Sequence, residues 1–235
     1  MAYIYVLKIK KNLEKDIYEN IDLVSINRQN KIKKYKFLKD SYRSLAAALI
    51  VRYALCNKLG CKNEDLIFET TSYGKPFLKV HDNKEVYFNI SHSGDYVVCA
   101  IDDNECGIDV ESLINYDVGI AENTFHPKEI ILLRKFTNIK EKVQYFNFLW
   151  TMKESYVKAL GIGLSKPLSS FYVVKEKDGI LISDSDKQSK IFTICKCLEL
   201  DDNYTLSFVG NSNVTNLIMI TDTEFMRIIK KLKSS

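Results

Sequence analysis

The sequence lacks the patterns by which several classes of protein are recognised. None of its 6 cysteines belongs to a C-x-x-C pair, which argues against a zinc site or a disulfide framework, so we expect reduced thiols. The apolar start soon breaks into lysines, unlike a signal peptide or a membrane span, and no low-complexity tract stands out. The 235 residues, 46% of them hydrophobic, allow a substantial core. We therefore expect a globular cytoplasmic protein, built as one large domain or two small halves, with no membrane partner.

The formal net charge of +4 is mild and does not by itself imply a nucleic-acid partner. Basic residues nevertheless gather in two places, at 28–39 and at 227–233. Such runs are usually solvated helix faces, but they also suit phosphates or an acidic protein. They give no support for nucleic acid, and we expect none.

The periodicity of apolar residues predicts both helices and strands. Residues 41–59 combine helix formers, a period near 3.6 residues and a terminal Gly60, which predicts a helix. The segment "YVVCAID" at 96–102 is short, β-branched and almost continuously apolar, as expected of a strand buried on both faces. After the turn "NECG", the segment "IDVES" at 108–112 starts a second extended piece. We expect these two segments to form a hairpin or a similar strand pair.

Downstream, helical and extended patterns alternate again. His126-Pro127 marks a helix start, and residues 140–160 predict a long helix closed by Gly161. Asp178-Gly179 stands between alternating segments, which is a hairpin signal. Further strands are expected at 192–200, 204–210 and 216–221, with a final helix at 224–233. The fold class is therefore α+β.

Two acids lie one residue apart in the segment "IDVES". Residues i and i+2 of a strand point to the same face, so Asp109 and Glu111 project together while Ile108 and Val110 enter the core. A cation would relieve the repulsion between the carboxylates, although acids at strand ends are also ordinary surface residues.

A second acid lies on the predicted helix at 140–160. Glu154 and Lys158 are four residues apart and so share one helix face. They form either an ordinary surface ion pair or part of a site.

His92 stands in Ser-His-Ser-Gly, where Gly94 permits a tight turn. A histidine among hydroxyls is more often a hydrogen-bonding residue than a catalyst, and no G-x-S-x-G elbow supports a Ser-His pair. A turn that exposes hydroxyls, amides and an imidazole suits an anion such as phosphate. Gly74-Lys75-Pro76 predicts another constrained turn, whose lysine is otherwise an ordinary loop residue.

Four motifs follow one another along the chain. They are GKP at 74–76, FNISHS at 88–93, GIDVE at 107–111, and WTMKE at 150–154 followed by Lys158 and Gly161. Together they closely resemble the 4′-phosphopantetheinyl transferases of the Sfp type, with a motif core at 73–168. That family moves the phosphopantetheine arm of coenzyme A onto a serine of an acyl or peptidyl carrier protein and leaves adenosine 3′,5′-bisphosphate. The resemblance therefore implies coenzyme A as substrate, a carrier protein as partner and Mg²⁺ as cofactor.

The resemblance also implies roles for particular residues. Asp109, Glu111 and Glu154 are the expected metal-site residues, and Glu154 is also the candidate general base, directly or through a metal-bound water. Glu154, Lys158 and His92 are the expected catalytic residues. The residues expected to contact coenzyme A are Arg43, Lys75, Ser91, His92, Asp109 and Lys158.

Two features near the nucleotide are less defined. The residue that meets the 3′-phosphate stays open among Lys31, Lys33, Lys34 and Lys36. Asp95 is expected to point away from the site, because an acid facing the phosphates would weaken their binding.

The chain length fits the long form of the family, in which two similar halves related by pseudo-twofold symmetry share one chain. We expect a monomer with one site between an N-terminal half at 1–104 and a C-terminal half at 105–235. The segment 121–145, with Arg134 and Lys135 among apolar residues, is expected to contact the carrier, although it would equally suit a helix packed on its own core.

Two other functions compete with this interpretation. One is a different magnesium-dependent phosphoryl transferase or phosphatase, and the other is a non-catalytic module that binds coenzyme A or nucleic acid. The intact set of Asp109, Glu111, Glu154 and Lys158 argues against the second. The sequence leaves open whether the carrier serves fatty acid, polyketide or nonribosomal peptide biosynthesis.

Overall fold

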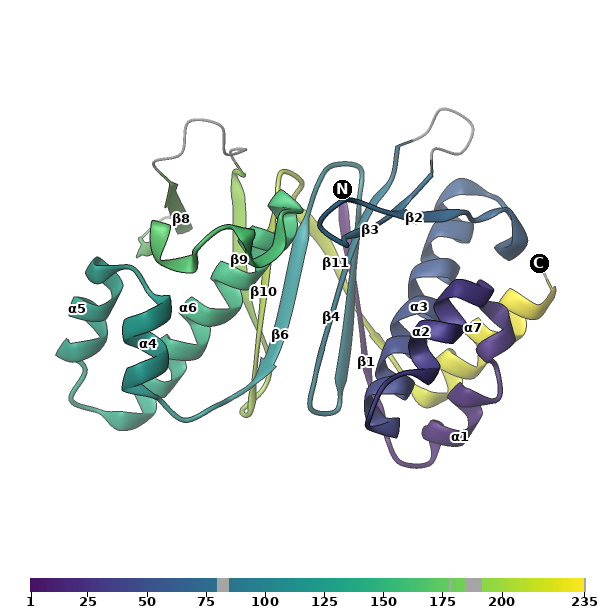
Figure 1. Ribbon diagram of the computed structural model, residues 1–235, viewed down its shortest axis with the longest axis horizontal. Helices are drawn as coiled ribbons and strands as arrows, with labels where there is room; N and C mark the ends of the chain where they lie inside the picture. Colours follow the sequence, from purple (N-terminus) through teal and green to yellow (C-terminus); the bar gives the residue numbers. More distant parts are fainter. Residues whose placement is uncertain (80–84, 178, 185–191, 235) are drawn as a thin grey trace.

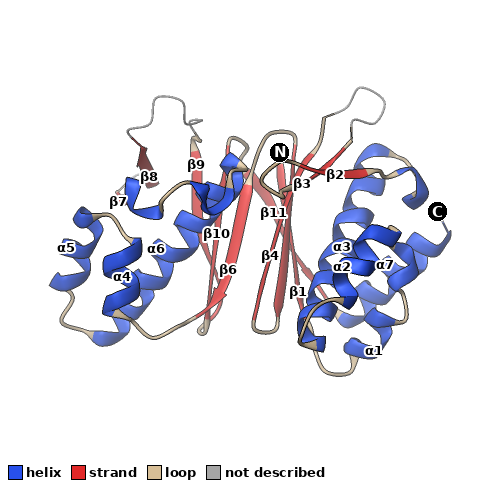
Figure 2. Cartoon of the chain, viewed as in Figure 1, coloured by secondary structure: helices blue, strands red, loops and turns tan. Residues whose placement is uncertain are grey.

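The computed structural model describes residues 1–79, 85–177, 179–184 and 192–234. Figures 1 and 2 show two groups of helices on the outside and two β-sheets between them. The chain is thus layered as helix, sheet, sheet and helix, which confirms the α+β class. In the described part of the chain, no helix is long and apolar enough to cross a membrane.

The first sheet brings together the two ends of the chain. Its order is β11-β1-β5-β4, with β1 parallel to β11 and antiparallel to β5. Its strands are β1 (Ala2–Lys8), β4 (Tyr87–Ser93), β5 (Tyr96–Asp102) and β11 (Val214–Ile220). The helices packed with it are α1 (Leu13–Tyr18), α2 (Ile26–Lys33), α3 (Leu38–Leu59) and α7 (Asp222–Ser234). The last strand and helix therefore lie with the first half, although the expected division at residue 104 would place them in the second.

The second sheet has the order β6-β10-β9, and both pairs are antiparallel. Its strands are β6 (Gly107–Ser112), β9 (Ile194–Asp201) and β10 (Tyr204–Gly210), and its helices are α4 (Val118–Thr124), α5 (Pro127–Lys135) and α6 (Ile139–Leu160). Two separate hairpins are β2 (Phe68–Thr70) with β3 (Pro76–Leu78), and β7 (Phe171–Glu176) with β8 (Gly179–Asp184). Short 3₁₀ turns are η1 (Ile21–Leu23), η2 (Asn63–Asp65), η3 (Gly163–Ser165) and η4 (Leu168–Ser170).

Three hydrophobic cores separate the layers. One lies between the first sheet and its helices, one lies around α6, and the third lies between the two sheets. Strand β5 is buried at every residue because alternate side chains enter different cores, Val97 and Cys99 on one face and Val98 and Ala100 on the other. The prediction of a strand buried on both faces is therefore confirmed.

The expected pairing of β5 with β6 is wrong. Strand β5 instead forms a hairpin with β4 around Gly94, and its other edge pairs with β1. Since both edges of β5 are occupied, the chain crosses to the other sheet, where Asp109 of β6 lies opposite Ser207 of β10. The sequence pattern identified both strands but not their partners.

Several other predictions are confirmed. Helix α3 begins slightly earlier than expected, and α6 spans 139–160 and ends at Gly161, whose φ of 76° is left-handed. Strands β7 and β8 form the expected hairpin, although Asp178 of its turn lies outside the described residues.

Lys153 forms a buried ion pair and two buried hydrogen bonds in the core of the second half. Its side chain is fully buried, and its Nζ lies 2.9 Å from Glu129 Oε2 and donates to the carbonyl oxygens of Leu168 (2.8 Å) and Phe171 (2.6 Å). Glu129 in turn accepts from Val173 N at 2.7 Å. This ion pair therefore ties α5 and α6 to the segment that leads into β7.

Lys153→Met should lower the free energy of unfolding by about 3–5 kcal/mol, because it leaves the buried Glu129 carboxylate without its cation. Urea denaturation at pH 7 measures this loss. Lys140→Met removes an exposed lysine from the same helix and should change the free energy by less than about 0.5 kcal/mol. Equal effects of the two substitutions would contradict the structural role of Lys153.

Candidate active site

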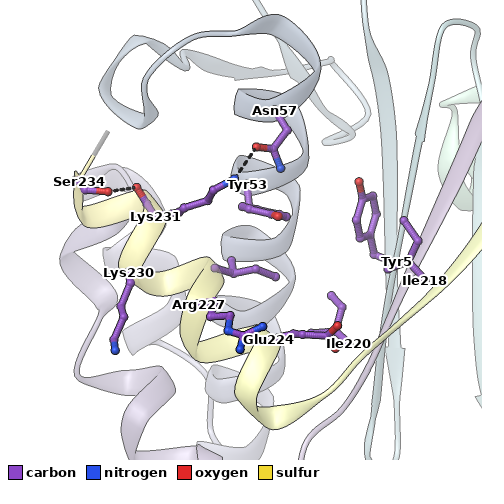
Figure 3. Close-up of a pocket in the computed structure, with 11 residues that line it drawn as sticks. Tyr5, Tyr53, Asn57, Ile218, Ile220, Glu224, Arg227, Lys230, Lys231 and Ser234 are labelled. Carbon is purple, nitrogen blue, oxygen red and sulfur yellow. Dashed lines mark hydrogen bonds between the residues drawn. The ribbon is translucent and has the colours of Figure 1, made fainter.

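A pocket of about 640 Å³ lies between the halves and gathers most of the predicted site residues. The first half contributes β4, the β2–β3 hairpin, α2 and α3, and the second contributes β6 and α6. The predicted residues in its wall are Lys31, Ser91, His92, Asp109, Glu111, Glu154 and Lys158. A second hollow, of about 680 Å³, lies between α3, α7, β1 and β11, where Tyr5 and Ile218 project toward the helices (Figure 3). It contains none of the predicted site residues.

Strands β4 and β6 meet through side chains at the junction of the halves. Alternate residues of β4 point toward β6: Asn89 Oδ1 accepts from Ile108 N (2.9 Å), and Ser93 Oγ accepts from Ser112 N (3.2 Å). Between them, Ser91 Oγ donates to Asp109 Oδ1 at 2.7 Å. The polar alternation in FNISHS therefore aligns the two halves at the site.

Asp109 lies at the centre of this junction. Its Oδ1 also accepts from Lys158 Nζ at 2.6 Å, while its Oδ2 is buried and has no hydrogen-bond partner among the described residues. The residue is only 2% exposed. Lys158 thus pairs with Asp109 across the pocket, and its Nζ lies 3.0 Å from Ser91 Oγ as well.

Helix α6 packs closely on β6, which brings Glu154 and Lys158 into the same pocket as Asp109 and Glu111 of β6. A Cβ at Gly107 would lie 1.9 Å from the carbonyl oxygen of Ser155, so only glycine allows this approach. Thr151 and Ser155 fix the helix by hydrogen bonds to Ser207, with Oγ to Oγ at 2.7 Å and Oγ to carbonyl oxygen at 2.8 Å. These supporting residues carried no recognisable signal in the sequence apart from the glycine.

Burial disturbs the titration of several pocket residues. It raises the pKa of Glu154, and the Asp109 charge adds to the rise while Lys158 opposes it. Burial likewise raises the pKa of Glu111, against a hydrogen bond from Ser93. Burial lowers the pKa of His92, as do the nearby charges of Arg43 and Lys158. The lowered pKa favours the uncharged imidazole, and the raised pKa values mean that ionising either glutamate has an energetic cost.

The acids suit a hard divalent cation such as Mg²⁺. The partnerless Oδ2 of Asp109 is an oxygen that a cation would satisfy, and both glutamates ionise against burial and the charge of Asp109. Within the described ranges, no three acidic, histidine or cysteine side chains converge closely enough to form a complete metal centre. Mg²⁺ normally keeps water and substrate oxygens as ligands, so an incomplete set of protein ligands is compatible with it. The magnesium site stays a prediction.

Basic and hydroxyl groups also line the pocket. Lys31 is the member of the four candidate lysines that is in the wall, and Arg28 lies there too, donating to Ser44 Oγ at 2.8 Å. Arg28 was noted only as part of the basic run, because nothing in its local sequence separates it from its neighbours. Its position becomes visible only when α2 packs on α3.

Arg43 lies on α3, next to the pocket residue Ser44. It forms an ion pair with Asp40 at 2.7 Å, and its charge lowers the pKa of His92. Its Nε is buried and has no partner in the described part of the chain. Arg43 is not among the residues that line the pocket, so a direct contact with coenzyme A stays a prediction.

Asp95 also lies outside the pocket wall and pairs with Lys39 at 2.7 Å.

Lys75 is not among the residues that line the pocket, and its contact with coenzyme A stays a prediction. Its neighbours Gly74 and Pro76 line the pocket, but its own Nζ lies 2.6 Å from the carbonyl oxygen of Lys158, at the end of α6. The structure therefore brings Lys75 to the end of α6 rather than into the pocket wall.

Comparison with known proteins gives matches along most of the chain. Residues 11–104 match a family model described as 4′-phosphopantetheinyl transferase, N-terminal, and residues 105–209 match that of the 4′-phosphopantetheinyl transferase superfamily. The chain is 36% identical over 213 residues to 4′-phosphopantetheinyl transferase gsp of Aneurinibacillus migulanus, which covers 90% of this chain and 87% of that protein. It is 34% identical over 189 residues to 4′-phosphopantetheinyl transferase Sfp of Bacillus subtilis (strain 168), covering 80% and 82%.

These matches place the chain in the 4′-phosphopantetheinyl transferase superfamily. Within it the chain belongs to the Sfp type, as the four motifs predicted, and it is an enzyme of the holo-carrier-protein synthase type.

Glu154→Gln should stabilise the ligand-free protein at neutral pH. The folded-state pKa of Glu154 lies above its ordinary value of 4.5. At a pH above the folded-state pKa, the ionised carboxylate therefore lowers the free energy of unfolding. At a pH below 4.5 the carboxyl group is protonated in both states, and the loss disappears. The melting temperature of the variant should therefore exceed that of the wild type at pH 7.5, and the difference should shrink toward pH 4.5. Glu176→Gln, which removes an exposed carboxylate, is the control. A difference between variant and wild type that is independent of pH would contradict the pKa assignment.

Proposed function

We propose that this enzyme transfers the 4′-phosphopantetheine arm of coenzyme A to a serine of an acyl or peptidyl carrier protein and releases adenosine 3′,5′-bisphosphate. The observation that carries the proposal is the junction at Asp109, where hydroxyl, lysine and carboxylate groups from both halves meet beside a wall of cationic side chains. The pocket wall combines the groups that a pyrophosphate reaction needs, cationic side chains for phosphates and carboxylates for a metal and a proton.

The chemistry is substitution at phosphorus, so the residues mainly position groups and neutralise charge. Lys158 would pair with the negative charge of the pyrophosphate, since its ammonium lines the pocket in contact with Asp109 and Ser91. His92, whose lowered pKa keeps it neutral, would hydrogen-bond to a phosphate of coenzyme A. Lys31 and Arg28 lie where they would contact further phosphate groups.

Glu154 is the proposed acceptor of the proton from the carrier serine. Its raised pKa makes it a stronger base than an exposed glutamate and brings its proton affinity closer to neutral pH. Asp109, Glu111 and Glu154 would hold Mg²⁺ together with substrate phosphate oxygens, and the ion would neutralise charge on the pyrophosphate.

Intact-protein mass spectrometry tests the reaction directly. A recombinant apo carrier protein, incubated with this enzyme, coenzyme A and Mg²⁺, should gain the mass of the phosphopantetheine arm. Glu154→Gln should abolish that gain, because the serine loses its proton acceptor. The absence of any mass gain on both a fatty-acid carrier and a peptidyl carrier, with folded enzyme that binds coenzyme A, would reject the proposal.

We further propose that the carrier contacts the surface formed by α4 and α5. Ile131 and Leu132 are neighbours on α5 and are 56% and 39% exposed, so together they form a small apolar patch. Arg134 and Lys135 are exposed beside them, and Arg134 pairs with Glu122 of α4 at 2.7 Å. An apolar patch with basic neighbours matches an acidic helical carrier.

Lys135→Glu should raise the KM for the carrier roughly tenfold, because it replaces attraction by repulsion at the edge of the contact. The Kd for coenzyme A, measured by calorimetry, should stay the same. Lys15→Glu makes the same charge change on α1, in the other helical layer, and serves as control. If both variants keep the wild-type KM for the carrier, α5 is not the contact surface.

A further inference from the structure

We propose that Lys75 is a positioning residue that holds the end of α6, and with it Lys158, in place across the junction of the two halves. The inference deepens the proposed transferase function and rests on it for its kinetic consequences. It differs from a direct contact between Lys75 and coenzyme A, in which the ammonium would bind a phosphate group.

The ammonium of Lys75 lies among three backbone carbonyl oxygens of the second half. Its Nζ is 2.6 Å from the oxygen of Lys158, 3.3 Å from that of Ala159 and 3.3 Å from that of Cys106. The last carbonyls of a helix have no partner within the helix, and a cation there also meets the negative end of the helix dipole. Lys75 therefore acts as the C-terminal cap of α6, although it belongs to the other half.

The turn that carries Lys75 and the end of α6 both have features that allow this contact. Around Lys75, the turn is closed by hydrogen bonds from Thr71 N to the carbonyl oxygen of Lys75 (2.9 Å) and from Lys75 N to Thr71 Oγ1 (3.1 Å). At the end of α6, a Cβ on Gly161 would lie 3.3 Å from Lys75 Cδ, closer than most real contacts. Gly161 thus ends the helix and also leaves room for the methylene groups of the lysine.

The contact reaches the site at two points. The carbonyl oxygen that Lys75 holds most closely belongs to Lys158, whose own Nζ lies 2.6 Å from Asp109. Cys106, the third acceptor, precedes the Gly107 on which α6 packs. Lys75 therefore fixes the backbone of Lys158 against the strand that carries the acids, while Gly74 and Pro76 form part of the pocket wall.

Steady-state kinetics with two donors separate positioning from phosphate binding. Lys75→Met should lower kcat about tenfold or more with both coenzyme A and 3′-dephosphocoenzyme A, since a small displacement of Lys158 weakens its action in the transition state. KM for coenzyme A and the ratio of kcat/KM between the two donors should stay near the wild-type values. Lys79→Met, on an exposed lysine of the same hairpin that pairs with Glu69, is the matched control.

Direct phosphate binding by Lys75 would give a different kinetic pattern. If Lys75 binds a phosphate of the nucleotide, KM for coenzyme A rises, kcat is retained and the preference for coenzyme A over its 3′-dephospho form falls. That pattern, or wild-type kinetics in the variant, overturns the proposal.

Hydrogen exchange followed by mass spectrometry tests the same contact without substrate. In Lys75→Met, amides at 157–163 should exchange faster, whereas amides of β5 should keep their protection because that strand is buried in two cores. Unchanged exchange at 157–163 overturns the proposal. Because this measurement needs no transfer activity, it still tests the contact if the wild-type enzyme transfers nothing to a carrier.

Discussion

The buried carboxylate of Asp109 is the constraint around which the two halves are arranged. A charge that is 2% exposed needs partners, and Asp109 takes one from each half, the Ser91 hydroxyl and the Lys158 ammonium, at the same oxygen. Asp109 has the Ser91 hydroxyl as a partner only when the first half packs against the second. The requirement places β4 beside β6 and turns the charged face of α6 toward the junction, so the site exists only when the halves are packed together.

Packing in the second half holds α6 in place although Glu154 on this helix and Asp109 repel each other. Glu154 is brought near Asp109, and burial makes its ionisation costly. The opposing free energy comes from contacts on other faces of α6: Thr151 and Ser155 bind Ser207, and Lys153 is buried with Glu129. Adjacent residues of one helix thus have different roles: Lys153 stabilises the fold, and Glu154 lines the pocket.

Local patterns predicted the elements well, and long-range pairing decided what they do. Helices α3 and α6 were predictable because each ends in a glycine that adopts a left-handed conformation. The burial of β5 was predictable because its apolar residues do not alternate with polar ones. Its pairing was not, because β1 occupies the edge at which β6 was expected, and β1 comes from almost 100 residues earlier in the chain. Lys31 and Arg28 look like their basic neighbours until α2 packs on α3.

The sequence by itself determined the chemical groups and the family. Short motifs place a histidine, three acids and a lysine at fixed positions, and local spacing is enough to show which of them share a strand or helix face. Only the tertiary structure decided which groups meet. Ser91 and Asp109 are 18 residues apart, and Lys75 and Lys158 are 83 apart. No local propensity encodes such contacts, because burial removes water as a partner and leaves each polar group to bind whatever the packing of distant segments brings near it.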